Sequence, residues 1–365
     1  SLKNLVVGES KDPQDRNVFH RLTLIAFFAW VGLGADGLSS SCYGPEEAFR
    51  ALGEHRYLGI FVALLSALTV FLISASYTQI IKLFPMGGGG YLVASKLLNP
   101  TIGMVSGCAL LIDYVLTISI SIASGADAIF SFLPGDWLHY KLFVAAVGVV
   151  MLMWMNLRGV KESVLILTPI FLVFVITHLF AIIYSVIVNL GSIPQMINSS
   201  VSEIGVTHSE LGLFGLVFVI LRAYSLGAGT FTGIEAISNG LPILREPKVE
   251  TGKKTMSYMA VSLAFTVFGL MVAYLLFNVV PQEDKTLNAV LFESLASSWA
   301  DPWGKLFVLI ALISEAMLLF VAAQTGFVGG PGVLANMAVD RWMPSRFSSL
   351  SDRLVSQNGI LLMGL

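Results

Sequence analysis

The chain has 365 residues, of which 56% are hydrophobic and 12% are charged. The charged residues gather between long apolar runs, which excludes a soluble globular domain and is typical of an all-α polytopic membrane protein. A formal net charge of −2 and the lack of a basic run exclude a nucleic-acid partner. We therefore expect a multi-pass protein of the cell (inner) membrane, with the lipid bilayer as a partner.

The two ends of the sequence carry separate signals. Residues 1–21 are polar and charged and lack the apolar stretch of a signal peptide, so we expect a cytoplasmic N-terminal segment. A new apolar run opens at about residue 357 and stops at Leu365, from which we expect a fragment of a longer protein. Cys42 and Cys108 both lie in apolar runs and are expected to be small packing residues.

The first apolar run, at 22–50, is interrupted over residues 32–47 by small and polar side chains. An unwound backbone in hydrocarbon leaves N–H and C=O groups unsatisfied, so such a break persists only where protein or a water-filled cavity covers it. Transporters hold their substrates at breaks of this kind. The interruption therefore predicts a binding site near the middle of the membrane.

Two groups of acids in this break have different expected roles. Gly44 and Pro45 followed by Glu46 and Glu47 predict the start of a new helix, because proline suits the first helical position and acids suit the first turn. Asp36 is expected to precede the break, where the carbonyl end of a half-helix favours a cation or a proton. A charge at this depth costs at least about 2.5–3.5 kcal/mol, which favours a functional role. The alternative is a structural carboxylate bonded to Ser39, Ser40 or a free backbone amide.

Further spans are expected at 57–84, 102–133, 139–157 and 162–189. The span at 102–133 carries a polar stripe, because at 100° per residue Asp113, Thr117, Ser121 and Ser124 fall on one face. Serine and threonine also serve interhelical packing in membranes, whereas Asp113 favours a functional surface.

The second interrupted run lies at 212–243, with its break at 227–235. Thr232 and Glu235 have the spacing of a capping box, with Thr232 at the cap and Glu235 reaching back to it. Glu235 is equally suited to a proton or ion site, and the two interpretations are compatible. Spans at 255–280 and 303–326 follow, separated by a polar stretch at 281–302 with a short helix expected over 287–299.

Other polar features carry weaker signals. The glycine-rich stretch at 85–91 lacks the end of a phosphate-binding loop and predicts a sharp turn with positive φ angles, so we expect no nucleotide or other cofactor. Asp127 and Glu315 are isolated acids that predict either secondary proton sites or ion pairs with a neighbour, and His178 predicts a hydrogen-bonded interior histidine. No catalytic arrangement of side chains is evident, so we do not expect an enzyme.

The basic residues indicate the orientation. With a cytoplasmic N-terminus, 15 of the 21 lysines and arginines fall on the cytoplasmic side, five fall outside, and Arg222 lies within a span. The two interrupted runs then cross the membrane in opposite directions, as in an inverted repeat. We expect a first five-helix repeat at 22–189, an external loop at 190–211, and a second repeat at 212–365 that is incomplete in a ninth span.

Several motifs together resemble the amino acid–polyamine–organocation superfamily, and within it the KimA-type potassium–proton symporters of bacteria. They are DGLSS at 36–40, YGPE at 43–46, PMGGGGY at 85–91, DYVLT at 113–117, NLRG at 156–159, TGIEAISN at 232–239, TGF at 325–327 and DRWMP at 340–344. Their order is kept over nearly the whole chain.

The resemblance implies a LeuT-type core of five plus five helices in which helices 1 and 6 are discontinuous, and twelve spans in the whole protein. It implies a substrate or ion site at Asp36, Tyr43, Asp113, Tyr114, Thr117, Ser121, Thr232 and Glu235. Within this set, Asp36, Tyr43, Asp113, Thr117 and Thr232 are the expected potassium ligands, and Asp36, Asp113 and Glu235 are the candidates for proton coupling.

The leading hypothesis is a secondary active transporter that imports potassium by proton symport with alternating access. Its partners are then the potassium ion and the proton, with a homodimer as a further partner to consider. The alternative is a proton-coupled amino acid or polyamine permease, in which the helix N-termini at Gly44 and Gly233 bind a substrate carboxylate. A sensor that binds a ligand without transport is a third class.

Overall fold

A computed structural model describes residues 23–365 except 86, 88, 132, 159 and 352–354. The expected N-terminal segment at 1–21 therefore lies outside the described residues. Within the described part, α-helices and short 3-10 helices form every regular element, apart from one isolated parallel bridge between Leu24 and Leu244.

The first half of the chain begins with the interrupted run and continues through four long helices. Its elements are α3 (Ala26–Gly32), α4 (Gly34–Ser39), η1 (Ser40–Cys42), α5 (Gly44–Leu52), η2 (Gly53–Leu58), α6 (Gly59–Leu83), α7 (Gly89–Leu97), α8 (Pro100–Phe130), η3 (Gly135–Tyr140), α9 (Lys141–Arg158) and α10 (Val160–Val188).

The second half contains the second interrupted run. Its elements are η4 (Leu190–Ser192), α11 (Ile193–Leu226), η5 (Gly227–Phe231), α12 (Ala236–Asn239), η6 (Leu241–Ile243), α13 (Lys248–Leu276), α14 (Leu287–Ala296), α15 (Trp303–Val339), η7 (Ser345–Phe347) and α16 (Gln357–Gly364). Both predicted interruptions are thus present as short helices and turns.

Seven helical stretches of the described residues are long and apolar enough to cross a membrane. One of them, Gly34–Leu83, combines most of the first expected span with the second, because η2 follows α5 directly and leads into α6 through a kink at His55. Large apolar side chains such as Leu68, Phe71 and Leu72 remain exposed on α6. Such exposed faces are what a hydrocarbon surrounding requires, and the protein is a multi-pass membrane protein.

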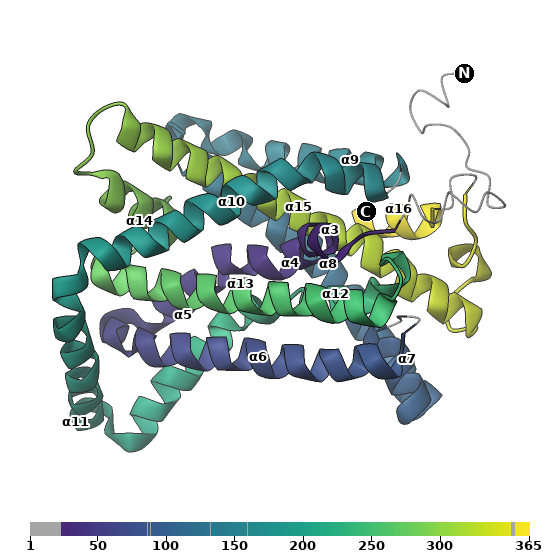
Figure 1. Cartoon of the computed structure of the whole chain (residues 1–365), viewed down its shortest axis with the longest axis horizontal. Helices are drawn as coiled ribbons and strands as arrows, with labels where there is room; N and C mark the ends of the chain where they lie inside the picture. Colours follow the sequence, from purple (N-terminus) through teal and green to yellow (C-terminus); the bar gives the residue numbers. More distant parts are fainter. Residues whose placement is uncertain (1–22, 86, 88, 132, 159, 352–354) are drawn as a thin grey trace.

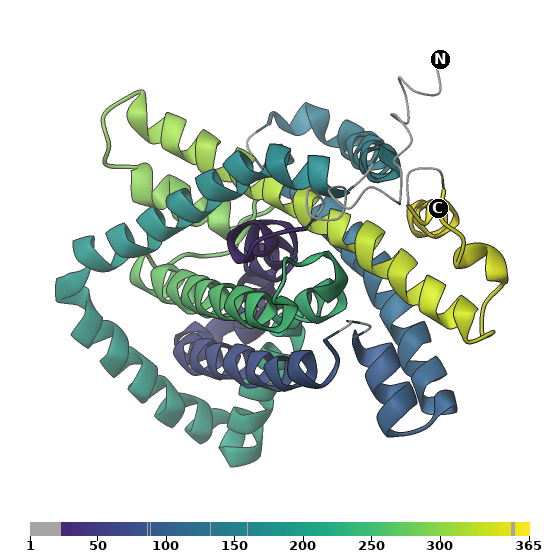
Figure 2. The ribbon, with the colours of Figure 1, turned by 45° about the vertical axis from the view of Figure 1, so that its right-hand side comes forward.

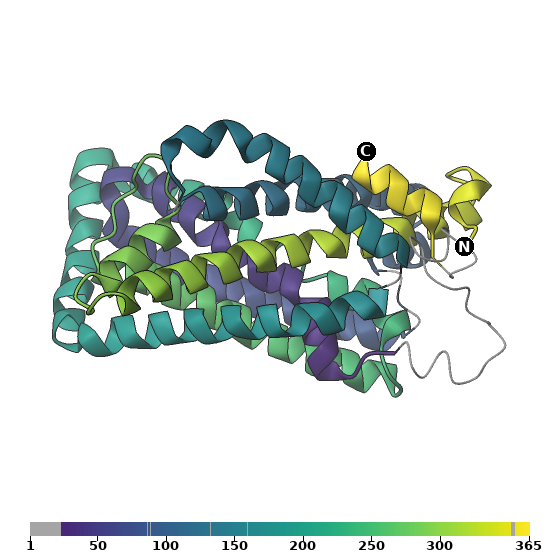
Figure 3. The same cartoon turned by 90° about the horizontal axis from the view of Figure 1, so that it is seen from above.

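The long helices run along the long axis of the molecule. Figures 1 and 3 show α10 and α15 extended along it, with α14 at one end and α7, α12 and α16 at the opposite end. The first interrupted helix occupies the interior: α3 and α4 pack against α10, α13 and α15, and Figure 2 shows α3 enclosed by these helices. All six residues of α4 are buried.

Two regions differ from the sequence-based expectation. The stretch 190–211, predicted as a loop, is helical because Met196, Ser200 and Thr207 recur at helical spacing and form a buried face within a largely polar segment. The last long span extends to Val339 rather than to residue 326, and Pro331 lies inside it.

Two smaller predictions are confirmed. The helix expected over 287–299 is α14, and the Thr286 side chain caps it by accepting a hydrogen bond from the Ala289 amide at 3.2 Å. In the glycine-rich turn, Gly87 and Gly89 have φ angles of 78° and 47°. A Cβ atom on Gly87 would meet the Pro242 ring at 2.7 Å, so this turn packs directly against the segment that follows α12.

Candidate transport site

The two interruptions pack against each other through glycine. A Cβ atom on Gly233 would lie 2.6 Å from both the Asp36 carboxyl carbon and the Gly37 amide nitrogen. Gly233 also has a φ of 80°, which glycine adopts without strain. On the other side of the contact, a Cβ atom on Gly44 would meet the Thr230 backbone. Glycine therefore allows the two unwound backbones to touch.

Side-chain hydrogen bonds join the same two segments. The Ser40 hydroxyl lies 2.7 Å from the Thr230 carbonyl oxygen and 2.6 Å from the Gly37 carbonyl oxygen. The Tyr43 and Thr232 hydroxyl oxygens are 2.9 Å apart, and Tyr43 packs over Gly229. These contacts satisfy part of the backbone that the breaks leave without helical partners.

The helix start predicted after the first break is confirmed. Helix α5 begins at Gly44, with Pro45 in its first turn together with Glu46 and Glu47. Glu46 also pairs with Arg50 at 2.8 Å and accepts a hydrogen bond from the Leu287 amide at 3.0 Å. This acid therefore has structural partners on its own helix and at the start of α14.

The capping box predicted after the second break is wrong. Helix α12 begins at Ala236 with Glu235 as its N-cap residue and without a side-chain cap, whereas the Thr232 hydroxyl donates to the Gly229 carbonyl at 2.8 Å. The turn at Gly233 separates Thr232 from the helix start, so the spacing of a capping box does not produce its geometry here.

Asp36 lies inside the interrupted segment rather than before it, because the chain already leaves regular helix at Leu33 and Asp36 falls in the first turn of α4. Its side chain is 1% exposed, and its Oδ2 atom is buried without a hydrogen-bond partner. The Ser39 hydroxyl donates to the Asp36 backbone carbonyl at 2.7 Å. Neither Ser39 nor Ser40 therefore holds this carboxylate, because both hydroxyls donate to backbone carbonyls, whereas the expected alternative of a free backbone amide stays a prediction.

The three acids predicted for proton coupling are brought together. Asp36, Asp113 and Glu235 lie close enough for their charges to interact, although they come from α4, α8 and the turn before α12. Among the ion pairs between described residues, none involves these three acids. The site therefore concentrates acidic groups without a lysine, arginine or histidine partner.

The predicted polar face of α8 is divided between the centre and one end of the molecule. Tyr114, Thr117 and Ser121 are buried, and the Ser121 hydroxyl has no hydrogen-bond partner. The Tyr114 hydroxyl accepts a hydrogen bond from the Asn239 amide, which ties α8 to α12. Ser124 instead lines a pocket near α14.

Other residues at the site were not among the predicted ligands. Tyr77 on α6 lies within electrostatic range of Glu235 and Asp113. Thr325 on α15 is 2% exposed, and its hydroxyl has no partner. Thr325 and Asn239 belong to motifs that carry the family resemblance, whereas Tyr77 lies in an apolar run with no such signal.

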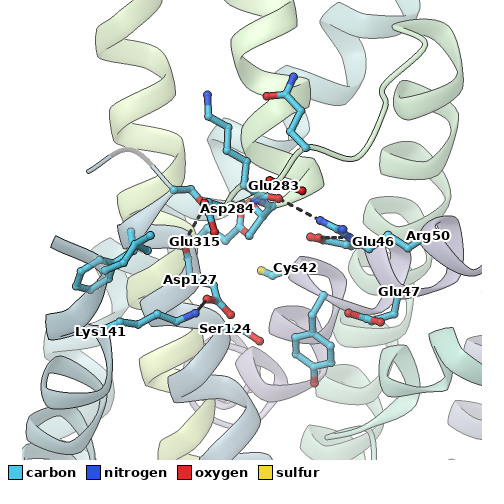
Figure 4. A pocket seen from close by; sticks show the side chains of 17 residues that line it. Cys42, Glu46, Glu47, Arg50, Ser124, Asp127, Lys141, Glu283, Asp284 and Glu315 are labelled. Atoms are coloured by element: carbon cyan, nitrogen blue, oxygen red, sulfur yellow. Dashed lines mark hydrogen bonds and ion pairs between the residues drawn. The ribbon is translucent and has the colours of Figure 1, made fainter. Parts of the chain in front are cut away.

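Two pockets approach the centre from opposite ends. One pocket, which we call the α14 pocket because it lies beside that helix, has a volume of about 290 Å³ and includes Tyr43 in its lining (Figure 4). The other, which we call the α12 pocket, has a volume of about 300 Å³ and is lined by Tyr114, Asn239 and Thr325 among others. Tyr43 and Tyr114 therefore each line a different pocket.

Asp127 and Glu315, the two isolated acids, each have a partner, which is one of the two outcomes expected from the sequence. Asp127 forms an ion pair with Lys141 in the α14 pocket. Glu315 is 1% exposed and lies 3.6 Å from Nε2 of His178, whose Nδ1 is 3.0 Å from the Phe174 carbonyl oxygen. His178 is therefore a hydrogen-bonded interior histidine, as predicted.

Within the described residues, no group of three or more histidine, cysteine or acidic side chains has the geometry of a metal site. Potassium is bound in proteins largely by carbonyl and hydroxyl oxygens, of which the two breaks expose several. A potassium site at the breaks would therefore combine such oxygens with carboxylates.

Comparison with known proteins agrees with this architecture. A family model described as amino acid permease matches residues 24–364. The chain is also 32% identical over 374 aligned positions to the potassium transporter KimA of Bacillus subtilis strain 168; the alignment covers all of this chain and 58% of the relative, so the chain spans less than two thirds of that protein's length. The chain therefore belongs to the amino acid permease family of the amino acid–polyamine–organocation superfamily, a family of membrane transporters.

Proposed function

We propose that the protein imports potassium together with protons by alternating access. The observation that carries this proposal is the group of three acids, Asp36, Asp113 and Glu235, which lie within electrostatic range at the helix breaks and form no ion pair among the described residues. A buried carboxylate is costly unless a cation or a proton compensates it. The group of three acids therefore favours a cation and a proton as the transported substrates.

The surrounding oxygens provide a way to replace the water shell of an ion. In this proposal Asp36 supplies the charge, while Tyr43 and Thr232 supply hydroxyl oxygens and the breaks supply carbonyl oxygens. Asp113 and Thr117 complete the site from α8. Glu235 takes the proton, because its carboxylate lies near that of Asp113. Two neighbouring carboxylates repel each other when both are charged, so one of them is readily neutralised while the other stays charged.

We place the N-terminus in the cytoplasm, following the distribution of basic residues. The α14 pocket then faces the outside, and the α12 pocket faces the cytoplasm. Five-helix inverted repeats at 22–189 and 212–365 would relate the two interrupted helices, and rocking of one repeat against the other would open the two pockets in turn.

A proton-coupled amino acid or polyamine permease is the second candidate, favoured by the family model that matches the chain. An α-amino acid would place its carboxylate at the starts of α5 or α12 and its amine at the acids. Since Asp36 and Glu235 lie beside these helix starts, they would repel the substrate carboxylate, which makes this arrangement less favourable than a bare cation.

The test is uptake of rubidium, as a potassium substitute, by proteoliposomes that contain the full-length protein. An inward proton gradient is expected to drive uptake, and Asp36→Asn is expected to abolish it. Rubidium uptake that does not depend on the proton gradient would contradict the proposed coupling of potassium to protons. Stabilisation by one amino acid in a thermal-shift screen, with none by potassium, would favour the second candidate.

A further inference from the structure

His178 and Glu315 form a buried pair that the proposed transport site does not use. They project from α10 and α15, and each is 1% exposed. Nε2 of His178 lies 3.6 Å from Oε2 of Glu315, and this nitrogen has no hydrogen-bond partner in the structure. Glu315 also lines the α14 pocket, so its carboxyl group stands at the wall of this cavity (Figure 4).

The hydrogen bonds around His178 fix its tautomer. Nδ1 lies 3.0 Å from the Phe174 carbonyl oxygen, and since a carbonyl can only accept, Nδ1 carries a proton. The nearby Thr177 hydroxyl donates to the carbonyls of Val173 and Phe174 and does not change this assignment. In a neutral imidazole Nε2 is then an unprotonated acceptor that faces a carboxyl oxygen.

A second chain of hydrogen bonds reaches the same carboxyl oxygen of Glu315. The Tyr274 hydroxyl donates to Oδ1 of Asn288 at 2.5 Å, which turns the Asn288 amide nitrogen toward Glu315. That nitrogen donates to Oε2 of Glu315 at 3.2 Å. Tyr274 and Asn288 are both fully buried, so this orientation is held by packing as well as by hydrogen bonds.

The other charged or titratable groups near Glu315 do not compensate it. Cys42, Glu46 and Tyr274 lie within its electrostatic range. The cations of the same pocket are otherwise occupied: Arg50 pairs with Glu46, Lys141 with Asp127, and Lys285 with Glu293. His178 is therefore the one base among the described residues that faces this carboxyl group at ion-pair distance.

These contacts leave room for one proton between the two side chains. A charged carboxylate opposite the lone pair of Nε2 would be repelled by it, and only the neutral Asn288 amide would compensate its charge. One proton on either atom removes the conflict, because it gives a neutral acid that donates to Nε2 or an imidazolium that donates to Oε2. The pair then carries no net charge.

We propose that His178 and Glu315 share one proton and form a second proton site, separate from the three acids at the helix breaks and open to the α14 pocket. The site also contacts the start of α14, because Glu315 holds Asn288 while Glu46 holds the neighbouring Leu287 amide. Its use in transport rests on the proposed proton coupling, whereas proton binding itself does not.

The test is infrared difference spectroscopy of the full-length protein during a pH titration from about pH 4 to about pH 10, a range that covers the ordinary carboxyl and imidazole groups. The spectrum of Glu315→Gln, which removes the carboxyl group at nearly constant side-chain volume, is subtracted from that of the wild type. The difference is expected to contain a carboxyl signal that changes with pH. In His178→Gln this signal is expected to differ from that of the wild type.

Two comparisons make the result specific. Asp127→Asn removes another acid of the same pocket, one that is already paired with Lys141, and is expected to leave the Glu315 signal in place. Tyr274→Phe frees the Asn288 amide and is expected to displace the signal without removing any acid. An absent Glu315 signal, or one that is identical with and without His178, would overturn the proposal. Since the measurement needs no transport, its failure is distinguishable from failure of the proposed function.

Discussion

At the scale of single residues, Asp36 decides the chemistry of the centre. Its carboxylate is buried with one oxygen lacking a partner, while neighbouring hydroxyls bond to backbone carbonyls instead. A protein that needed this acid only for structure would be expected to satisfy both of its oxygens. In the proposed function, a cation or a proton occupies the position beside this oxygen during transport.

We expect Asp36→Asn to reduce rubidium uptake by at least about tenfold, because it removes a charged ligand worth roughly 1.5–3 kcal/mol. Its thermal stability in detergent is expected to stay the same or rise, since the substitution removes a buried charge. Glu293→Gln, at an exposed ion pair with Lys285, serves as the control for uptake. Unfolding of Asp36→Asn would contradict the functional role and indicate a structural one.

The Tyr43–Thr232 contact gives a second residue-scale prediction. The hydroxyl oxygens are 2.9 Å apart and join the two interrupted helices. In a double-mutant cycle with Tyr43→Phe and Thr232→Val, we expect a coupling energy of about 1 kcal/mol in thermal or chemical unfolding. Strictly additive effects would show that the contact contributes nothing to joining the breaks.

At the scale of elements, the two interruptions act as one unit. Each is too short and irregular to satisfy its own backbone, and each covers the other through Gly44, Thr230 and Gly233. The pairing continues at one end of the molecule, where the Leu24 amide donates to the Ile243 carbonyl at 2.8 Å and the Arg245 amide donates to the Leu24 carbonyl at 2.9 Å.

Gly233→Ala is therefore expected to destabilise the protein. The new methyl group would meet Asp36 and Gly37 at 2.6 Å, in a backbone conformation that alanine adopts only with strain. The control is Gly205→Ala in the exposed part of α11, where a Cβ atom has nothing within 4 Å and where alanine favours helix by about 0.5–1 kcal/mol. Equal melting temperatures for the two variants would contradict the close packing of the breaks.

The sequence predicted these elements unevenly. The interruptions, the start of α5 and the polar face of α8 could be predicted because glycine, proline and isolated acids stand out against apolar runs. The geometry after the second break could not, because the spacing of Thr232 and Glu235 does not reveal that Gly233 turns the chain between them. The partners of Glu315 were equally hidden, since His178 and Asn288 are distant in sequence and meet only in the folded protein.

At the scale of the whole molecule, the two pockets are the basis of the proposed direction of transport. One lies beside α14 and includes Tyr43, and the other lies beside α12 and includes Tyr114. A transporter with alternating access needs two such approaches, each closed while the other is open. The proposed orientation makes the α14 pocket the entry for potassium and protons.

This orientation predicts which side of the membrane a thiol reagent reaches. In a background without Cys42 and Cys108, an impermeant reagent is expected to label Asp284→Cys, beside the α14 pocket, in intact cells. Arg346→Cys, at the opposite end, is expected to react only after the cells are permeabilised. The reverse pattern would place the N-terminus outside and would invert the assigned direction.

The central claim, proton-coupled potassium transport, is tested most directly by proton movement that potassium itself induces. Proteoliposomes with the full-length protein carry a pH-sensitive dye inside, and the membrane potential is clamped. Addition of potassium outside is expected to acidify the interior, and Asp36→Asn is expected to abolish this acidification. Potassium entry with no change in internal pH, or acidification that needs an amino acid instead of potassium, would contradict the account.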